Sequence, residues 1–139
     1  TNTLLQECSK EQVVNAYDNT ILYGDHVLGE SLQWLKRQAN QYATSLIYLS
    51  DHGESLGENN LYLHGLPYAI APDVQKHVPL ITWLSAAQQQ RSRLSMGCLK
   101  SRVQEPLSHD HLFHSVLGLL DIQTTLYQRD LDWFAPCVR

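Results

Sequence analysis

The sequence predicts an α/β fold in which helices are layered on a sheet. Three observations lead to this prediction. A long amphipathic stretch comes first, two short apolar runs rich in strand-forming residues follow it, and a second amphipathic stretch comes after them. The order helix, strand, long loop, strand, helix is typical of a layered domain. The length of 139 residues fits one such domain.

The composition narrows the class of protein. Hydrophobic residues make up 43% of the chain and charged residues 17%, which provides enough apolar side chain for a packed core. The formal net charge of -4, without a basic cluster, predicts that nucleic acid is not a partner. No apolar run reaches the roughly 18 residues of a membrane-spanning helix. The first ten residues lack the regions of a signal peptide and an initiator Met, so we expect the chain to come from a longer protein.

The first helix is predicted over residues 10–40. Ser9 opens a Ser-x-x-Gln capping box, which is typical of a helix start. Residues with steps of three or four then form one apolar stripe. Gly24 and Gly29 each weaken the helix by about 1 kcal/mol relative to Ala, and we expect them to allow close packing against a sheet. The stripe consists of Val14, Tyr17, Ile21, Gly24, Leu28, Leu32 and Leu35.

The apolar runs 44–49 and 78–84 are predicted strands, with Pro79 near the start of the second. Because both runs are nearly continuous, we expect strands that are covered on both faces and run parallel. A partial parallel sheet exposes an apolar edge that can pair with a second copy of the chain, so self-association is expected.

The C-terminal third gives weaker signals. Residues 85–106 are polar and fit no clear pattern. Ser108 can cap a helix that runs to about residue 121, with apolar residues on one face. We interpret the tail 126–139 as a short helix or an irregular packing element.

The stretch Ser-Asp-His-Gly-Glu-Ser-Leu-Gly-Glu at 50–58 is the first candidate site. Asp51 and His52 directly follow the strand at 44–49, and functional groups of α/β sheets collect at such strand ends. Gly53 permits a sharp turn, so both side chains can reach one ion. A carboxylate and an imidazole suit Zn²⁺, although two ligands do not complete a tetrahedral site. The spacing also fits an ordinary turn with a solvated imidazole.

The neighbouring residues strengthen the metal interpretation. Glu54 and Glu58 add carboxylates, and His64 adds a second imidazole in the motif Tyr-Leu-His-Gly. Such a loop is costly beside a buried strand unless it binds something charged, although it could also be well hydrated. His111 and His114 have helical spacing without an acidic partner loop, and we assign them to a helix surface.

Cys8, Cys98 and Cys137 form no Cys-x-x-Cys pair, which argues against a thiolate zinc site. Two alternatives remain from spacing alone. The three residues are buried thiols, or the protein is exported with a Cys98–Cys137 disulfide and an odd Cys8.

The segment YLSDHGESLGENNLYLHGLPYAIAP, followed by VPLITWLS, closely resembles the phosphoethanolamine transferases of Gram-negative bacteria. The likeness extends upstream through CSKEQVVNAYDNTILYGDHVLGESLQWL and weakens after about Ser85. These enzymes modify lipid A, include proteins that confer polymyxin resistance, and belong to the alkaline phosphatase and sulfatase superfamily. The resemblance implies a layered α/β/α sandwich, of which residues 1–139 are the C-terminal portion of one catalytic domain.

The resemblance also implies roles for individual residues. Asp51 and His52 match the family's pair of zinc ligands, and His64 matches a histidine that holds the transferred phosphate or a second zinc. Glu54 could face the ethanolamine ammonium group. Cys8 resembles the second cysteine of a short-range disulfide whose partner precedes Thr1, and a Cys98–Cys137 disulfide is predicted. The family's threonine nucleophile, a further zinc-binding glutamate and another histidine lie upstream of this chain, so we expect the chain alone to be inactive.

The reaction that the resemblance implies is a zinc-dependent transfer in two steps. A threonine takes phosphoethanolamine from a phospholipid, which we expect to be phosphatidylethanolamine, and a lipid A phosphate then receives it. The complete protein would be anchored in the Gram-negative inner membrane with its catalytic domain on the periplasmic face. Two alternatives stay open: a sulfatase- or phosphatase-type hydrolase that uses water as acceptor, and a non-catalytic binding module with a vestigial site.

Overall fold

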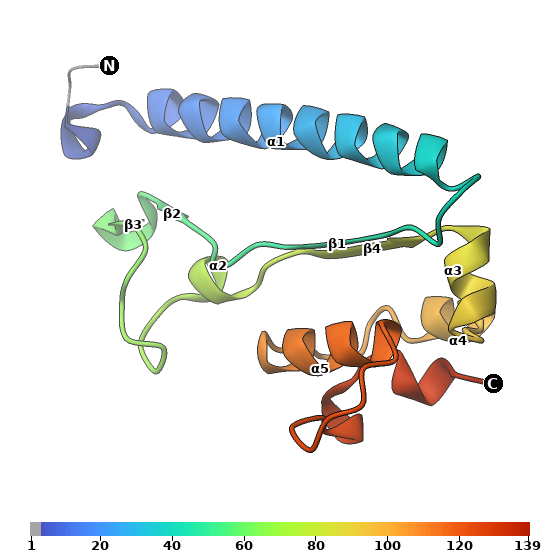
Figure 1. Ribbon diagram of the computed structural model, residues 1–139. Helices are drawn as coiled ribbons and strands as arrows, with labels where there is room; N and C mark the ends of the chain where they lie inside the picture. Colours follow the sequence, from blue (N-terminus) through green and yellow to red (C-terminus); the bar gives the residue numbers. More distant parts are fainter. Residues whose placement is uncertain (1–3) are drawn as a thin grey trace. The chain divides into compact units, whose positions relative to one another are not determined.

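A computed structural model of the chain describes residues 4–139. The chain divides into two compact units. The first unit contains the described residues up to Leu35 together with Leu46–Thr82, and the second contains Lys36–Ser45 and Trp83–Arg139. Helices and strands both occur, so the predicted α/β class is confirmed (Figure 1).

The long helix predicted over 10–40 is α1, Lys10–Gln38, which follows a short 3-10 turn, η1, at Leu5–Glu7. The capping box is confirmed: the Ser9 N–H donates to Gln12 Oε1 at 2.9 Å, and the Gln12 N–H donates to Ser9 Oγ at 3.2 Å. The expected close packing at Gly24 and Gly29 is wrong for the described residues, because a β-carbon at either glycine would meet nothing within 4 Å.

The two predicted strands are β1, Ser45–Leu49, and β4, Leu80–Leu84, which pair as neighbours in one two-stranded sheet. Thr44, just before β1, pairs with Ser85, just after β4: the Ser85 N–H donates to the Thr44 carbonyl at 2.9 Å. The start of one strand therefore lies beside the end of the other, and the pair is antiparallel rather than parallel (Figure 1). All five residues of β1 are half-buried, and an apolar run alone does not encode strand direction.

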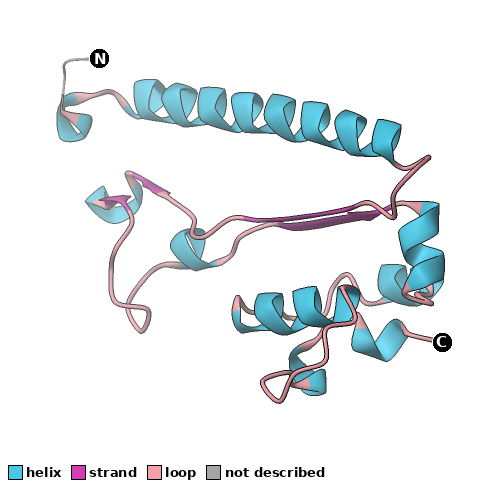
Figure 2. Cartoon of the chain, viewed as in Figure 1, coloured by secondary structure: helices cyan, strands magenta, loops and turns pink. Residues whose placement is uncertain are grey.

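The connection between these strands contains the elements that carry the candidate site. A hairpin of two very short strands, β2 at Ser55–Leu56 and β3 at Tyr62–Leu63, is joined by the 3-10 turn η2 at Glu58–Asn60. A single helical turn, α2 at Asp73–Lys76, follows before β4. Figure 2 shows how little of this segment is regular structure.

The second unit is mainly helical. The segment 85–106 contains two helices that the sequence did not predict, α3 at Ala86–Arg91 and α4 at Met96–Ser101, each capped by the hydroxyl of the serine before it. The helix predicted over 108–121 is confirmed as α5, Asp110–Leu119. The tail forms two 3-10 turns, η3 at Arg129–Leu131 and η4 at Ala135–Cys137.

A disulfide joins Cys98 of α4 to Cys137 of η4, which confirms the pair predicted from the sequence. The Ser95 N–H donates to the Cys137 carbonyl at 2.9 Å, so a main-chain bond lies beside the covalent link. Cys8 has no disulfide partner among the described residues and is half-buried.

The core of the second unit contains paired polar groups. Ser115 on α5 is fully buried, and its hydroxyl accepts a hydrogen bond from the Trp133 N–H at 2.9 Å. His114 is also buried and accepts from the Gln128 N–H at 3.0 Å, so its predicted position on a helix surface is wrong. These bonds hold the segment after α5 against that helix.

A second buried contact involves Asp132, whose carboxylate accepts from the Tyr127 hydroxyl at 2.7 Å and from the Phe134 N–H at 2.8 Å. Burial and this carboxylate partner raise the pKa of Tyr127 to about 12. Gly118 allows the approach, because a β-carbon there would overlap an Asp132 carboxylate oxygen.

The described helices include none with the length and apolar character that a bilayer crossing requires.

Candidate functional site

Three of the predicted site residues meet at the open end of the β2–β3 hairpin. The antiparallel register pairs Ser55 with Leu63, so the next pair along the ladder is Glu54 and His64. His52 lies two residues before Glu54, and residues two apart in an extended chain point to the same face. The hairpin therefore explains why side chains from two arms of the chain meet.

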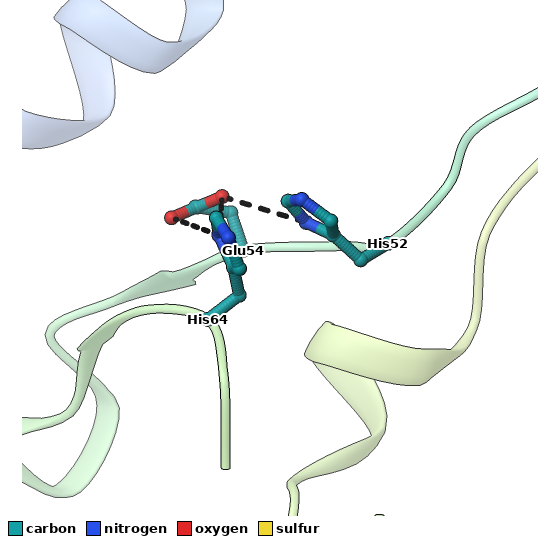
Figure 3. A group of neighbouring side chains, drawn as sticks. All are labelled: His52, Glu54 and His64. Atoms are coloured by element: carbon teal, nitrogen blue, oxygen red, sulfur yellow. Dashed lines mark hydrogen bonds and ion pairs between the residues drawn. The ribbon is translucent and has the colours of Figure 1, made fainter.

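The cluster His52, Glu54 and His64 has one ligand atom from each residue, and these atoms lie within 4.8 Å of one another. Figure 3 shows the Glu54 carboxylate linked to both imidazoles. Its Oε2 lies 3.2 Å from His64 Nδ1 and 3.9 Å from His52 Nδ1. The two rings are close and tilted by 31°, with centroids 3.6 Å apart. No second group of this kind occurs within residues 4–139.

The hydrogen bonds indicate which ring nitrogens are available. His52 Nδ1 lies 3.0 Å from the Gly53 carbonyl oxygen, which can only accept, so this nitrogen carries the proton. His64 Nδ1 faces the Glu54 carboxylate in the same way. In both residues Nε2 is then the nitrogen with a free lone pair, and a carboxylate that fixes a histidine through Nδ1 is a common arrangement behind metal ligands.

Asp51 lies at the edge of this cluster rather than inside it. Its Oδ2 is 3.6 Å from His52 Nε2, and its side chain is 88% exposed. The side chains of Asp51 and His52 are near each other, but Glu54 and not Asp51 contacts both histidines. His52 and Glu54 are two residues apart directly before the hairpin. This spacing is the sequence signal that could have placed their side chains on the same face.

The cluster is accessible from solvent, which suits a site for an exchanging ligand. The exposed fractions of the side chains are 36% for His52, 19% for Glu54 and 48% for His64. Glu54 is thus the most covered of the three charged or polar groups.

The hairpin loop is closed by Glu58, the third acidic residue of the 50–58 stretch. Glu58 Oε2 accepts from the Leu56 N–H at 2.7 Å. Hydrogen bonds from the backbone N–H groups of Glu58 and Leu56 lower the pKa of the Glu58 carboxyl. Gly57, with φ of 110°, supplies the left-handed backbone that the turn requires. Glu58 is therefore a loop residue that stabilises the hairpin.

The backbone beside the cluster is constrained. Leu63, directly before His64, has φ of 64°, a left-handed conformation that is unfavourable for a residue with a β-carbon. Gly53, directly after His52, lies against the carbonyl of Val74, where a β-carbon could not fit. Unusual backbone on both arms fits a site whose geometry is held by its surroundings.

The second unit has a cavity of about 430 Å³ that offers a different chemistry. Arg91, Arg93 and Arg129 are among its lining residues. Arg91 lies in the last turn of α3 and donates to the Leu120 carbonyl at 3.5 Å, where a cation interacts favourably with helix ends. Arg129 donates to the Ala135 carbonyl at 3.1 Å, so Arg91 and Arg129 both bind main-chain carbonyls of this unit, and we place the candidate site in the first unit.

Comparison with protein families gives one match, to the family described as Sulfatase, over residues 2–122. The chain belongs to the sulfatase family. The matched range contains the cluster and both strands of its hairpin. This family membership agrees with the α/β architecture and with a domain class that commonly binds metal ions.

Similar proteins include one named as a phosphoethanolamine transferase and one named as a phosphatidylethanolamine transferase. This sulfatase-family chain is 52% identical over 136 residues to "Phosphoethanolamine transferase EptA" of Salmonella typhimurium, which covers 97% of the chain and 25% of that protein. It is 39% identical over 118 residues to "Phosphatidylethanolamine transferase Mcr-1" of Escherichia coli, covering 85% of the chain and 20% of that protein. The chain thus spans about a quarter of the length of the curated relatives it matches.

Solved structures also match the whole sulfatase-family chain, among them domains of two phosphoethanolamine transferases. The soluble domain of lipooligosaccharide phosphoethanolamine transferase A from Neisseria meningitidis aligns with a TM-score of 0.92 at 42% identity, over 100% of this chain and 42% of that one. The C-terminal periplasmic domain of phosphoethanolamine transferase EptC from Campylobacter jejuni aligns with a TM-score of 0.85 at 44% identity, over 100% of this chain and 43% of that one.

Proposed function

We propose that this chain is part of the catalytic domain of a zinc-dependent enzyme that transfers phosphoethanolamine from phosphatidylethanolamine to a phosphate group of lipid A. The observation that carries the proposal is the 52% identity, over nearly the whole chain, to a phosphoethanolamine transferase, in a segment that contains the His52, Glu54 and His64 cluster. A non-catalytic module, the alternative, would not explain why a constrained backbone brings these three side chains together.

Asp51 and His52 fit a zinc ion as a pair of ligands. Two donors at typical zinc distances of about 2.1 Å on a tetrahedral ion lie about 3.4 Å apart. The 3.6 Å between Asp51 Oδ2 and His52 Nε2 is close to that value without any rearrangement. His52 Nε2 has a free lone pair, because Nδ1 donates to the Gly53 carbonyl. When bound, zinc would stabilise negative charge on the phosphoryl oxygens and on the attacking hydroxyl.

His64 and Glu54 fit the substrate side of the site. With Nδ1 held by Glu54 at 3.2 Å, His64 presents Nε2 to a phosphoryl oxygen or to a second ion. The Glu54 carboxylate also carries the negative charge that an ethanolamine ammonium group would pair with. Both groups act on the transferred moiety rather than on the lipid chains.

The remaining parts of the proposed site lie outside these residues. We infer a threonine nucleophile, which forms the covalent phosphoethanolamine intermediate, and further ligands from the rest of a catalytic domain of which residues 1–139 are the C-terminal portion. We also infer a periplasmic location for this domain, on a protein anchored in the Gram-negative inner membrane. The periplasmic C-terminal domain of the Campylobacter relative supports this placement.

The proposal is tested in the full-length enzyme that contains this chain. Transfer from labelled phosphatidylethanolamine to lipid A is measured for the wild type, Asp51→Ala and His52→Ala, together with bound zinc by mass spectrometry. We expect both variants to lose transfer and zinc. Unchanged turnover with full zinc occupancy in either variant would refute the ligand assignment.

The same preparation separates the closest competing activity. A sulfatase- or phosphatase-type hydrolase would release product to water from a sulfate or phosphate ester and leave lipid A unmodified. Hydrolysis without transfer by the wild type would replace our proposal with that function.

A further inference from the structure

Two arms of the chain carry the cluster, and little regular structure fixes their separation. His52 and Glu54 lie on the arm that enters β2, and His64 lies on the arm that leaves β3. The ladder between the arms has only two residue pairs. An isolated hairpin is marginally stable in water even when it is longer, so the spacing of the arms needs another constraint.

Gln75, on the helical turn α2, contacts both arms. Its side-chain Nε2 donates to Ser55 Oγ at 2.8 Å on one arm and to the Leu63 carbonyl at 3.1 Å on the other. Its main-chain carbonyl accepts from the Gly53 N–H at 3.0 Å. Each of these three bonded residues is the direct chain neighbour of a cluster residue.

These bonds are shielded from water. Gln75 is 7% exposed and Ser55 is 1% exposed. A primary amide has two N–H donors, and here both are used, one for each arm. Losing the amide would leave the buried Ser55 hydroxyl without this donor, which is more costly than losing an exposed bond.

The bond to Leu63 bears on a strained position. Leu63 has φ of 64°, and an unfavourable backbone conformation persists only where neighbouring contacts determine it. The amide of Gln75 holds the carbonyl of that residue. Relaxation of Leu63 would turn the following residue, His64, away from Glu54.

We propose that Gln75 is a positioning residue, which sets the distance between His64 and the arm that bears His52 and Glu54. This inference rests on the proposed function for its catalytic consequence. Gln75 touches neither metal nor substrate. It acts through the backbone on either side of the cluster.

The test replaces the amide by groups of similar size. In Gln75→Glu the amide nitrogen, which carries both donors, becomes one carboxylate oxygen that faces the Leu63 carbonyl, and in Gln75→Met the donors are removed without adding charge. Zinc affinity and the separate kcat and KM values are measured in the full-length enzyme, with rates expressed per zinc-loaded molecule. We expect zinc affinity to fall about tenfold, at the lower end of the usual effect of residues behind metal ligands. We also expect kcat per loaded molecule to fall.

The chain contains a closely matched control. Gln88 is 2% exposed, and its Nε2 also donates to a serine hydroxyl, Ser92 Oγ at 2.7 Å, and to a leucine carbonyl, that of Leu119 at 3.1 Å. It lies in the second unit, which contributes no residue to the cluster. Gln88→Glu should lower thermal stability to a similar degree while leaving zinc affinity and kcat per loaded molecule at their wild-type values.

Each outcome of these experiments either supports or overturns the positioning role of Gln75. Wild-type zinc affinity and kcat in both Gln75 variants, or equal losses in Gln75→Glu and Gln88→Glu, would overturn the positioning role. If the Gln75 variants do not fold, Ser55→Ala removes only one of the three bonds and should still weaken zinc binding. Normal zinc binding by that variant would then overturn the role. Absence of transfer by the wild type would instead refute the proposed function, and zinc affinity would still test Gln75.

Discussion

Removal of the Cys98–Cys137 disulfide should destabilise the second unit by about 4 kcal/mol. The cross-link closes a loop with a sequence separation of 39 residues. The chain-entropy model gives about 3 kcal/mol for a 15-residue loop and about 4.7 kcal/mol for a 100-residue loop, and 39 residues lie between these values. A typical domain has only about 5–15 kcal/mol of net stability, so the loss is a large fraction of the total.

The folded state should survive the loss of the link, which makes the measurement interpretable. The Ser95 N–H still donates to the Cys137 carbonyl, and Leu94 still forms a bridge with Val138. The energetic effect therefore arises mainly in the unfolded chain, which becomes less constrained. Since Cys137 is 2% exposed, removing its sulfur also leaves a small void that costs on the order of 1 kcal/mol.

The assay is urea unfolding of the oxidised chain and of the double variant Cys98→Ala/Cys137→Ala. With an m-value of about 2 kcal/mol per molar urea, a loss of 4 kcal/mol lowers the midpoint by about 2 M. Cys8→Ala is the matched control, because it removes a half-buried cysteine without a disulfide. Equal midpoints for the double variant and this control would refute the reasoning, as would alkylation of both sulfurs in unreduced protein.

Three further predictions concern single side chains. Gly53→Ala should destabilise the first unit and weaken zinc binding, because the added methyl would overlap the Val74 carbonyl. Gly24→Ala is the control, since Gly24 lies on an open helix surface and the change should stabilise the protein by about 1 kcal/mol. Thermal unfolding and zinc titration are measured for both variants. Burial and a carboxylate partner raise the pKa of Tyr127 to about 12, so the stability that its protonated form contributes is present below pH 10 and is lost between about pH 10 and 12. Unfolding free energies of Tyr127→Phe should lack that decline, and an identical slope in both proteins would contradict the pKa assignment. Glu54→Gln should raise KM for the ethanolamine donor about fivefold, because a neutral acceptor binds an ammonium group about 1 kcal/mol more weakly, and an unchanged KM would contradict ammonium binding.

Elements with local signals were predictable from the sequence. The start of α1 followed from Ser9 and Gln12, which bond to each other within one turn. The strands β1 and β4 and the helix α5 followed from apolar patterns within single segments. In each case the sequence pattern that indicates the element lies within a few residues along the chain.

Other features depend on contacts that no local pattern contains. The antiparallel direction of β1 and β4 is set by the path of the connection between them, which includes the hairpin and α2. The helices α3 and α4 lie in a polar segment, where their serine caps were the only usable signal. The burial of His114 depends on a bond from Gln128, fourteen residues away.

The candidate site depends partly on a local sequence pattern and partly on contacts between residues far apart in the chain. Its three cluster residues lie within thirteen positions, so one hairpin is enough to bring them together, and their residue types already suggested a metal and phosphate site. The precision of the arrangement has another origin. It depends on Gln75, twenty residues after Ser55, and on the strained Leu63, whose backbone conformation beside His64 no sequence pattern indicated. The residue types of the site therefore determine what it can bind, whereas the buried amide of Gln75 on α2 determines the positions of the site residues. A variant can lose these positions without any change in the residue types of the site.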